Sequence, residues 1–407
     1  MGTMDGASQD QQFSARGPWT GVLAVFLRLG LTSFGGPIAH LGYFRQAFVV
    51  RRQWLSEAAF ADLVALCQFL PGPASSQVGF AIGLIRAGPL GALAAWIGFT
   101  LPSALLMTTF ALGAASLKGT LATGLAHGLK LVAVAVVAQA LTGMARSLAP
   151  DARRAAIAVG AIALVTLAAP AYAQILAIAL GALAGLWLCR EAGEAALHPA
   201  PLRISRTAGF GALALFIVLL VGAPLLAGTT GQRPLAEFAA VYRSGALVFG
   251  GGHVVLPLLK DAVVAPGFVD QGRFLAGYGA AQAVPGPLFT FGAYLGAIMG
   301  GPEHGLLGAA LGLAALFLPG LLILLAALPF WSELRRRAWA QSAMRGANAA
   351  VVGILAAALY DPVWTSAVLS RSDFAAVAAG FVLLALFRAP PLLIVLLGAG
   401  YGVLGAV

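Results

Sequence analysis

Two glutamines, each leading into a Pro-Gly-Pro turn within an apolar stretch, are the most unusual feature of this sequence. The copies are Gln-Phe-Leu-Pro-Gly-Pro at residues 68–73 and Gln-Ala-Val-Pro-Gly-Pro at residues 282–287. Proline lacks an amide donor and clashes with the preceding turn, so each copy interrupts a helix. In hydrocarbon, backbone groups freed by such a break must be packed in protein or line a cavity. Breaks at matching places in two halves of a chain therefore predict a transporter binding site.

A second pair of breaks is rich in glycine, with Phe-Gly-Gly-Pro at residues 34–37 and Phe-Gly-Gly-Gly at residues 249–252. Glycine accepts either sign of φ and lets a ligand approach the main chain. Residues 74–77, Ala-Ser-Ser-Gln, resemble a further helix start with free amides and two hydroxyls. Four half-helix N-termini that converge would form an anion site. Close helix packing through small residues is the alternative, because the chain has 52 glycines. We favour the anion site because the breaks are paired.

A buried dianion also needs positive charge. Moving such an ion from water into a low-dielectric medium costs tens of kcal/mol of solvation free energy. Each helix N-terminus stabilises a negative charge by only about 0.3–1 kcal/mol. Arg28 and Arg45 flank the first glycine break, and Arg243 and Lys260 flank the second. Arg28 lies between leucines in an apolar run, where it either serves the site or extends to the membrane interface.

Other polar side chains near the breaks have two interpretations each. His40 and His253 follow the glycines and could bind an oxyanion, carry a coupled proton or simply pack. Gln68 and Gln282 could bind substrate or the loosened backbone, and we favour the backbone. The predicted substrate-binding residues are Arg28, Gly35, Gly36, His40, Arg45, Gln68, Pro71, Gly72, Pro73, Ser75, Ser76, Gly250, Gly251, Gly252, His253, Gln282, Pro285, Gly286 and Pro287.

Catalytic and metal-binding patterns are missing from the sequence. There is no Gly-x-Ser-x-Gly, no His-Glu-x-x-His and no Walker loop. Ser75 has no base near it in sequence, so intramembrane hydrolysis is the rival class without direct support. Cys67 and Cys189 are the only cysteines, and we expect both to be buried free thiols. We therefore predict no catalytic residue, no metal and no cofactor.

The composition predicts an integral membrane protein, all-α and polytopic. Of 407 residues 60% are hydrophobic and 9% charged, with a mean hydropathy of +0.92. The net charge of +10 comes from basic residues scattered singly between apolar runs, so we expect no nucleic-acid partner. These residues are typical of cytoplasmic loops. Residues 1–17 are predicted to be a disordered tail.

The sequence contains an internal repeat. Residues 54–60 correspond to residues 268–274, where Ser56 and Asp270 are equivalent helix N-caps. Further downstream, residues 151–170 correspond to residues 373–390. We predict a first repeat over residues 18–195 and a second over residues 235–407, joined by residues 196–234. The joining segment contains a single apolar helix, residues 207–227, which would invert the second repeat relative to the first.

The distribution of basic residues favours this inverted arrangement. If the paired breaks are re-entrant hairpins, Arg45, Arg51, Arg52, Arg86 and most other arginines fall on one side, which we assign to the cytoplasm. Nine full spans and four re-entrant elements result. Thirteen full spans remain possible.

The repeated segments resemble the chromate ion transporter family. Those at residues 34–40, 68–73 and 249–257 carry the resemblance, which extends over nearly the whole chain from about residue 20. The closest similarity is to long members with two homologous domains. It implies a carrier of the bacterial inner membrane that exports chromate and confers resistance, with sulfate as the competing dianion. Ser75 and Ser76 have no counterpart in the second repeat, so the two repeats would contribute unequally.

Without a nucleotide-binding motif, such a carrier would draw on ion or potential gradients and cycle by alternating access. Other oxyanions remain possible substrates. Membrane lipid is an expected partner, and a homodimer is possible.

Overall fold

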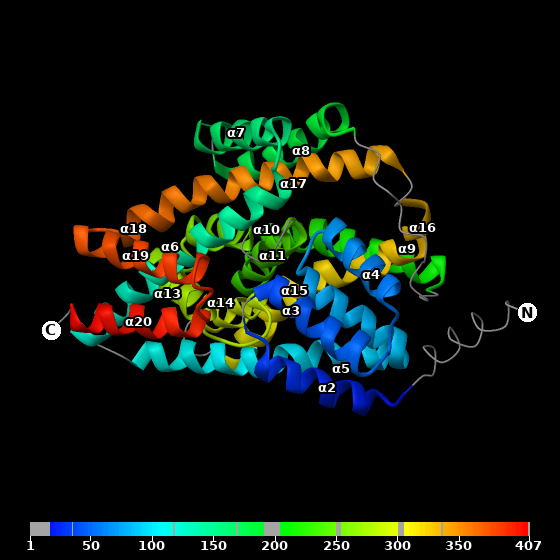
Figure 1. The fold of residues 1–407 in the computed structure, drawn as a ribbon, viewed down its shortest axis with the longest axis horizontal. Coiled ribbons are helices and arrows are strands. Elements are labelled where there is room, and N and C mark those ends of the chain that lie inside the picture. The colour runs from blue at the N-terminus through cyan, green and yellow to red at the C-terminus, as the bar shows by residue number, and fades with distance from the viewer. Residues whose placement is uncertain are drawn as a thin grey trace, which may run out of the picture.

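The computed structural model describes residues 17–34, 36–116, 119–167, 170–190, 204–249, 254–299, 305–334 and 337–405 (Figure 1). All the regular secondary structure in these residues is helical. Five helical segments are long and apolar enough to cross a membrane: Ala74–Gly113, Thr120–Leu148, Arg206–Thr230, Gly305–Phe330 and Ala338–Ala367. A hydrocarbon core of about 30 Å needs roughly 20 apolar residues per helix. The chain is therefore an all-α polytopic membrane protein, as predicted.

The first part of the chain begins with a helical hairpin. Helix α2 (Trp19–Thr32) leads to a break, after which α3 (Gly36–Phe44) continues into a π-helical segment, η1 (Arg45–Arg51). The ring of Phe26 on α2 lies 5.6 Å from that of Phe44 and 5.0 Å from that of Phe48. The second arm therefore folds back along the first.

A second hairpin joins α4 (Glu57–Phe69) to the start of α5 (Ala74–Ser116). Ser56 caps α4 by accepting a hydrogen bond from Ala59 N–H, as predicted. Helix α5 itself bends back at Gly88, whose φ is 66° and ψ −157°. Gly83 and Gly91 then touch so closely that neither has room for a Cβ. Helix α5 is therefore a short arm, residues 74–86, followed by a long arm, residues 89–116.

The second part repeats this order of elements. A turn again separates two arms that meet through glycines, because Gly296 lies against Gly308. Asp270 caps its helix by accepting from Arg273 N–H, as Ser56 does in the first part. The elements are α11 (Arg233–Ala246), α12 (Val255–Leu259), η4 (Lys260–Val264), α13 (Gln271–Ala281), η5 (Leu288–Thr290), α14 (Phe291–Met299) and α15 (Gly305–Ala327).

The long arms of the two parts run in opposite directions. The long arm of α5 begins beside Arg86, whose guanidinium lies 5.2 Å from the Trp54 ring just before α4. Its far end reaches Gly305, the first residue of α15, where Leu112 lies 3.9 Å from the position of an added Cβ. Helix α15 then leads through η6 (Leu328–Phe330) to Trp331, which packs on α4. Each long arm therefore ends where the other begins.

The remaining helices also pack across the two parts. Helices α7 (Ala152–Leu167) and α8 (Pro170–Leu188) lie on α17 (Ala338–Ala358), which crosses the upper part of Figure 1. Helices α19 (Arg371–Ala385) and α20 (Pro391–Leu404) pack on α6 (Thr120–Leu148). The connecting segment consists of α9 (Arg206–Ile217), η2 (Val218–Gly222) and α10 (Ala223–Thr230). After α17 the chain passes through η7 (Leu359–Trp364) and α18 (Thr365–Ala367).

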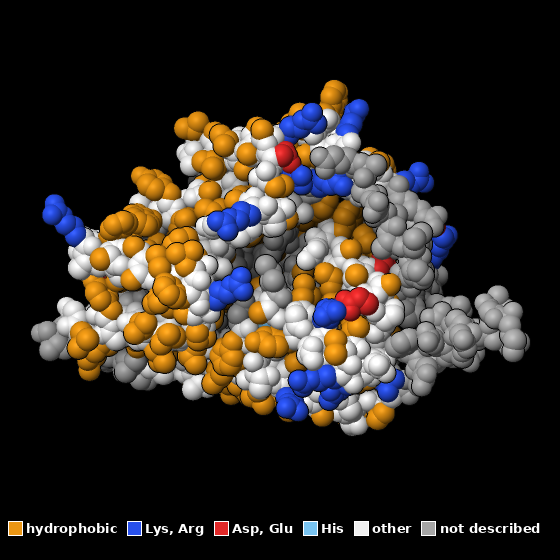
Figure 2. Space-filling view, viewed as in Figure 1, with side chains coloured by type: hydrophobic (Ala, Val, Ile, Leu, Met, Phe, Trp, Pro, Cys, Tyr) orange, Lys and Arg blue, Asp and Glu red, His pale blue; other side chains and the backbone are white. Residues whose placement is uncertain are grey.

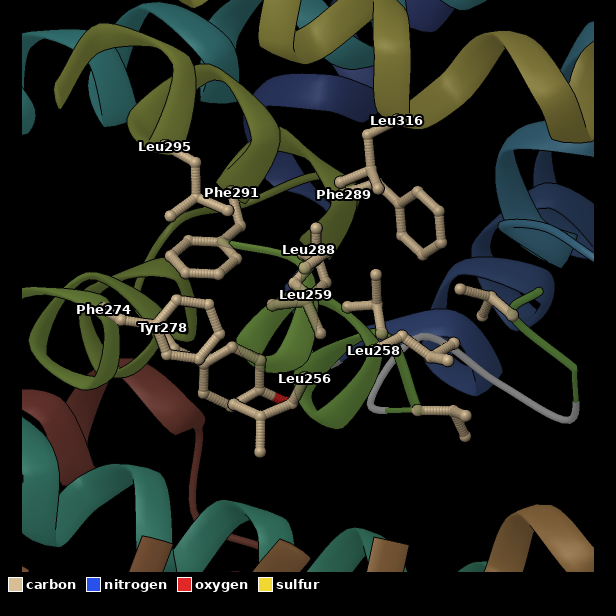
Figure 3. Packing of buried hydrophobic residues seen from close by; sticks show 14 of the residues in the cluster. Leu256, Leu258, Leu259, Phe274, Tyr278, Leu288, Phe289, Phe291, Leu295 and Leu316 are labelled. Atoms are coloured by element: carbon tan, nitrogen blue, oxygen red, sulfur yellow. The ribbon is translucent and has the colours of Figure 1, made fainter. Parts of the chain in front are cut away.

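Buried aromatic rings fill the space between the broken helices of the second part (Figure 3). Phe291 lies 5.3 Å from Phe274 and 5.7 Å from Tyr278, both edge to face. Lipid is as apolar as these side chains, so close packing rather than transfer from water holds them together. Cys67 and Cys189 are buried free thiols, as predicted.

Charged and hydrophobic side chains are unevenly distributed over the face seen in Figure 2. Most Lys and Arg side chains visible in Figure 2 lie in its right half, whereas the left half is largely hydrophobic. The same face is hollowed near its middle, below α17. The count of nine full spans stays a prediction, because α7 with 16 residues and α19 with 15 are short for a crossing.

Candidate functional site

The first Pro-Gly-Pro turn closes against the second part of the chain. Gly72 has a φ of +121°, which L side chains rarely adopt. Its N–H donates a 2.7 Å hydrogen bond to the carbonyl of Val248, just before the second glycine break. A Cβ added to Gly72 would lie 2.8 Å from Gly320 Cα, next to Pro319 in α15. The turn is therefore built for contact between the two repeats.

The second Pro-Gly-Pro turn makes the equivalent contacts with the first repeat. Gly286 has a φ of +97° and donates a 2.8 Å hydrogen bond to the carbonyl of Ser33, just before the first glycine break. A Cβ added to it would lie 2.9 Å from Ser103 Oγ, next to Pro102 in the long arm of α5. The broken helices of each repeat thus meet those of the other, and the freed backbone groups are satisfied reciprocally.

A glutamine does hold the loosened backbone, but it is Gln77 rather than the predicted Gln68. Gln77 Nε2 donates to the carbonyl of Pro71 at 2.9 Å and to that of Gly320 at 2.8 Å. Gln68 is exposed, and Gln282 donates to Tyr278 O, one turn earlier in the chain, at 3.4 Å. The sequence signal for Gln77 was its place on the first turn after Pro-Gly-Pro.

His40 lies at the centre of the first repeat's polar groups. The residue is fully buried on α3, and its Nδ1 lies 3.3 Å from Ser75 Oγ on the short arm of α5. Its ring meets Phe99 edge to face at 5.2 Å. The carbonyl of Phe99 in turn borders Gly286. The structure therefore brings His40, Ser75 and the second Pro-Gly-Pro turn to one place.

We call the buried polar residues around these turns the polar cluster: Ser33, His40, Ser75, Ser76, Gln77, Thr100 and Ser103. Several of its polar atoms have no hydrogen-bond partner among the described residues, namely Ser33 Oγ, His40 Nε2, Ser76 Oγ, Gln77 Oε1 and Thr100 Oγ1. An unpartnered buried polar group costs about 1–3 kcal/mol. Because most of these atoms can donate, and the first amides of α5 stand beside them, the cluster is suited to an anion.

Four members of the cluster are not among the residues predicted from the sequence: Ser33, Gln77, Thr100 and Ser103. Thr100 and Ser103 lie on either side of the proline in the long arm of α5, and Ser33 ends α2. Thr100, Ser103 and Ser33 are each small polar residues in a largely apolar run, beside a helix break or a proline. That combination is the sequence signal by which these residues could have been found.

The predicted arginines lie outside the polar cluster. Arg28 is exposed on α2, one turn before the hairpin bends. Arg45 is exposed too, and its Nε donates to Glu57 Oε1 at 2.6 Å across the outer end of the hairpins. No Lys or Arg belongs to the described part of the cluster.

The remaining predicted site residues divide between buried turns and positions that are not described. Gly36 has a φ of +78° and starts α3. Pro73, Pro285 and Pro287 are buried, and Pro71 is half-buried. Gly35, Gly250, Gly251, Gly252 and His253 lie outside the described residues.

Comparison with known proteins assigns the class. The family model described as chromate transporter matches two segments of the chain, residues 20–186 and 235–403. The chain therefore belongs to the chromate transporter family and carries two copies of its repeat. It is a multi-pass membrane protein of a transporter family, which argues against an enzyme.

Individual relatives extend over most of the chain. The chromate transport protein of Pseudomonas aeruginosa is 28% identical over 84% of this chain and 80% of its own length. The chromate transport protein of Cupriavidus metallidurans is 25% identical over 83% of this chain and 81% of its own. An uncharacterized transporter of Methanocaldococcus jannaschii is 25% identical over 83% and 82%, respectively. No solved structure matches the chain.

Proposed function

We propose that the protein is a secondary active carrier that exports chromate across the bacterial inner membrane and so confers chromate resistance. Its two repeats would have inverted topology, with the breaks forming re-entrant hairpins around a midplane anion site. The family and the relatives named for chromate transport support the substrate. The opposite directions of the two long arms support the inversion.

The observation that carries the proposal is the reciprocal contact of the turns. Gly72 N–H bonds Val248 O and Gly286 N–H bonds Ser33 O, at 2.7 and 2.8 Å. Four helix breaks are thereby gathered where buried hydroxyls lack partners. Broken helices at a repeat interface are the arrangement around which inverted-repeat carriers alternate their access. Relative movement of the repeats would strain these same two bonds.

The membrane potential can drive export directly. An inside-negative potential of 100 mV gives about 2.3 kcal/mol for each negative charge moved outward, hence about 4.6 kcal/mol for a dianion. The arginine-rich ends of the helices would face the cytoplasm in this orientation.

Arg28 is our proposed source of positive charge. It lies on the arm that ends at Ser33, and a charged residue in an apolar helix is retained mainly for function. Arg28→Gln should abolish chromate export while the protein still reaches the membrane. Arg51→Gln, at the outer end of the same hairpin, is the matched control and should export normally. Full export by Arg28→Gln would remove this residue from the site.

Uptake into everted membrane vesicles tests the function as a whole. Vesicles containing the protein should accumulate labelled chromate when an inside-positive potential is imposed. Labelled sulfate is tested in parallel, and unlabelled sulfate added in excess measures competition. Accumulation of sulfate but not chromate would show that sulfate is the substrate and would leave the proposed carrier mechanism unchanged. Failure to move either anion under any ion gradient would overturn the carrier assignment and favour an intramembrane enzyme.

A further inference from the structure

The polar cluster is suited to an anion, but its members carry no fixed positive charge. They are hydroxyl groups, one amide and one imidazole. Neutral donors alone leave the charge of a dianion uncompensated, and an unpaired buried charge is costly. The imidazole of His40 is the member of the cluster that can become positive, by taking up a proton.

The contacts of His40 leave one ring nitrogen open. Its Nδ1 lies 3.3 Å from Ser75 Oγ, whereas its Nε2 is buried and meets no hydrogen-bond partner in the described part of the chain. The ring lies edge to face on Phe99. The next residue, Thr100, also has a buried hydroxyl without such a partner. Unpartnered groups from α3 and from the long arm of α5 therefore lie on either side of the Phe99 ring's own segment.

The elements around His40 supply no carboxylate that could balance a proton on its ring. Residues 19–51 and 74–116, which include α2, α3, η1 and α5, contain no Asp or Glu. The arginines of these residues are either exposed or, in one case, placed over the Trp54 ring at 5.2 Å; in chain order they are Arg28, Arg45, Arg51 and Arg86. The turn at residues 285–287, which meets the same elements, carries no charge either.

A proton on His40 and an anion in the cluster would therefore stabilise each other. Without an anion, a charged ring in this apolar bundle has no counterion, so we expect the ring to be neutral. With an anion present, a protonated ring donates from Nε2 to the anion and from Nδ1 to Ser75 Oγ. Ser75 then accepts, and its own hydroxyl proton is free to point at the anion. Such charge-assisted hydrogen bonds are about twice as strong as neutral ones.

From this arrangement we propose that binding of an anion at the polar cluster is coupled to the uptake of one proton by His40. The inference rests on the proposed function and names the group that supplies positive charge inside the cluster, whereas Arg28 lies outside it. The proton comes from water, and no covalent bond of the anion changes. Anion affinity should therefore rise as the pH falls.

Binding of sulfate and chromate to the detergent-purified protein tests this coupling. Chromate itself takes up a proton near neutral pH, whereas sulfate stays a dianion, so sulfate separates protonation of the protein from protonation of the ligand. Isothermal titration calorimetry in buffers of different ionisation enthalpy should show about one proton taken up for each anion bound. Where this uptake is complete, the Kd should increase about tenfold for each unit rise in pH.

A variant at His40 assigns the proton. His40→Gln keeps an amide donor in the ring's place but cannot be protonated. It should bind either anion about tenfold or more weakly and take up no proton from the protein's side, because it loses a hydrogen bond from a charged donor. His127→Gln is the matched control, since His127 of α6 pairs with Asp373 of α19, and it should keep the proton uptake of the wild type.

The outcomes distinguish this inference from the carrier assignment. Sulfate binding without proton uptake, or equal proton uptake by the wild type and His40→Gln, would overturn the role of His40 and leave the carrier intact. If only chromate binds, the difference between the wild type and His40→Gln decides, because the ligand's own proton is common to both. Binding of neither anion at any pH would overturn the anion site itself and this inference with it.

Discussion

The two repeats share a backbone plan but differ in the chemistry of their matched positions. Where the first repeat has Ser33, Ser75, Ser76, Gln77, Thr100 and Ser103, the second has, in the same order, Val248, Phe289, Thr290, Phe291, Phe317 and Gly320. Of these, only Thr290 keeps a hydroxyl, which donates to Pro287 O at 2.9 Å. In the first repeat, hydroxyls and an amide surround the turns, and several lack partners. In the second, rings pack face to edge, with Phe289 and Phe317 5.5 Å apart.

This difference distinguishes the residues that build the helix breaks from the side chains that could bind an anion. Both repeats supply turns, prolines and tight glycines, which build the breaks. The described side chains that could bind an anion come almost entirely from the first repeat, whereas aromatic rings occupy several of the matched positions of the second. Duplication followed by specialisation of one copy explains the arrangement.

Changes at the two central glycines should have the largest effects. In Gly72→Ala, the alanine must adopt the positive φ of this turn, and its Cβ lies 2.8 Å from Gly320 Cα. We therefore expect the free energy of unfolding to fall by about 3–5 kcal/mol. Gly286→Ala should cost less, about 2 kcal/mol, because the atom in its way is Ser103 Oγ, which can rotate. Thermal unfolding in detergent measures both. Gly42→Ala, with open space around it, is the control, and equal losses at Gly72 and Gly42 would contradict the reciprocal contact.

Removal of one hydroxyl of the polar cluster should separate function from stability. Thr100→Val deletes a buried hydroxyl that has no partner among the described residues, so the fold should be unchanged or slightly more stable. If that hydroxyl serves the anion, chromate export should fall about tenfold or more, since a hydrogen bond to a charged group is worth about 1.5–3 kcal/mol. Thr108→Val is the control, because Thr108 Oγ1 donates to Ala104 O within its own helix. Normal export by Thr100→Val would place the hydroxyl outside the pathway.

Replacement of Gln77 and of Gln282 should lower the stability by different amounts, both smaller than the largest glycine effect. Gln77→Leu leaves the carbonyls of Pro71 and Gly320 without their donor and should cost about 2–3 kcal/mol. Gln282→Leu removes a long 3.4 Å bond to Tyr278 O, a local contact one turn away, and should cost less than about 1 kcal/mol. Urea or thermal unfolding of the two purified variants provides the comparison. A larger loss at Gln282 would reverse our assignment of the bridging residue.

The smallest expected effect concerns pH. Asp151 precedes α7, where hydrogen bonds from the backbone N–H and the side chain of Arg154 lower the pKa of its carboxyl. A lowered pKa stabilises the fold above the carboxyl's ordinary pKa, and this contribution is lost as pH falls through the lowered value. Asp151→Asn should therefore flatten the acid side of the stability curve slightly. If Asp151→Asn leaves the stability curve unchanged at every pH, the Asp151–Arg154 ion pair contributes nothing to stability.

The sequence predicted the breaks better than the side chains around them. Proline and glycine act on their own backbone, so the interruptions at residues 71–73 and 285–287 follow from local chemistry. The reversal at Gly88 was not predicted. The N-caps Ser56 and Asp270 are equally local. The contact of Gly72 with Val248 depends on how two distant segments meet, which no local pattern encodes. For the same reason the exposed Gln68 could not be distinguished from the bridging Gln77.

The reciprocal bonds also constrain how the protein is made. Gly72 leaves the ribosome 176 residues before Val248, and at 5–20 residues per second this interval is roughly 9–35 s. For that time the first repeat sits in the bilayer with an interrupted helix whose main chain lacks its final acceptor. Chaperones or insertion machinery that shelter polar backbone would be needed until the second repeat arrives. Completion of the fold therefore depends on the two repeats meeting.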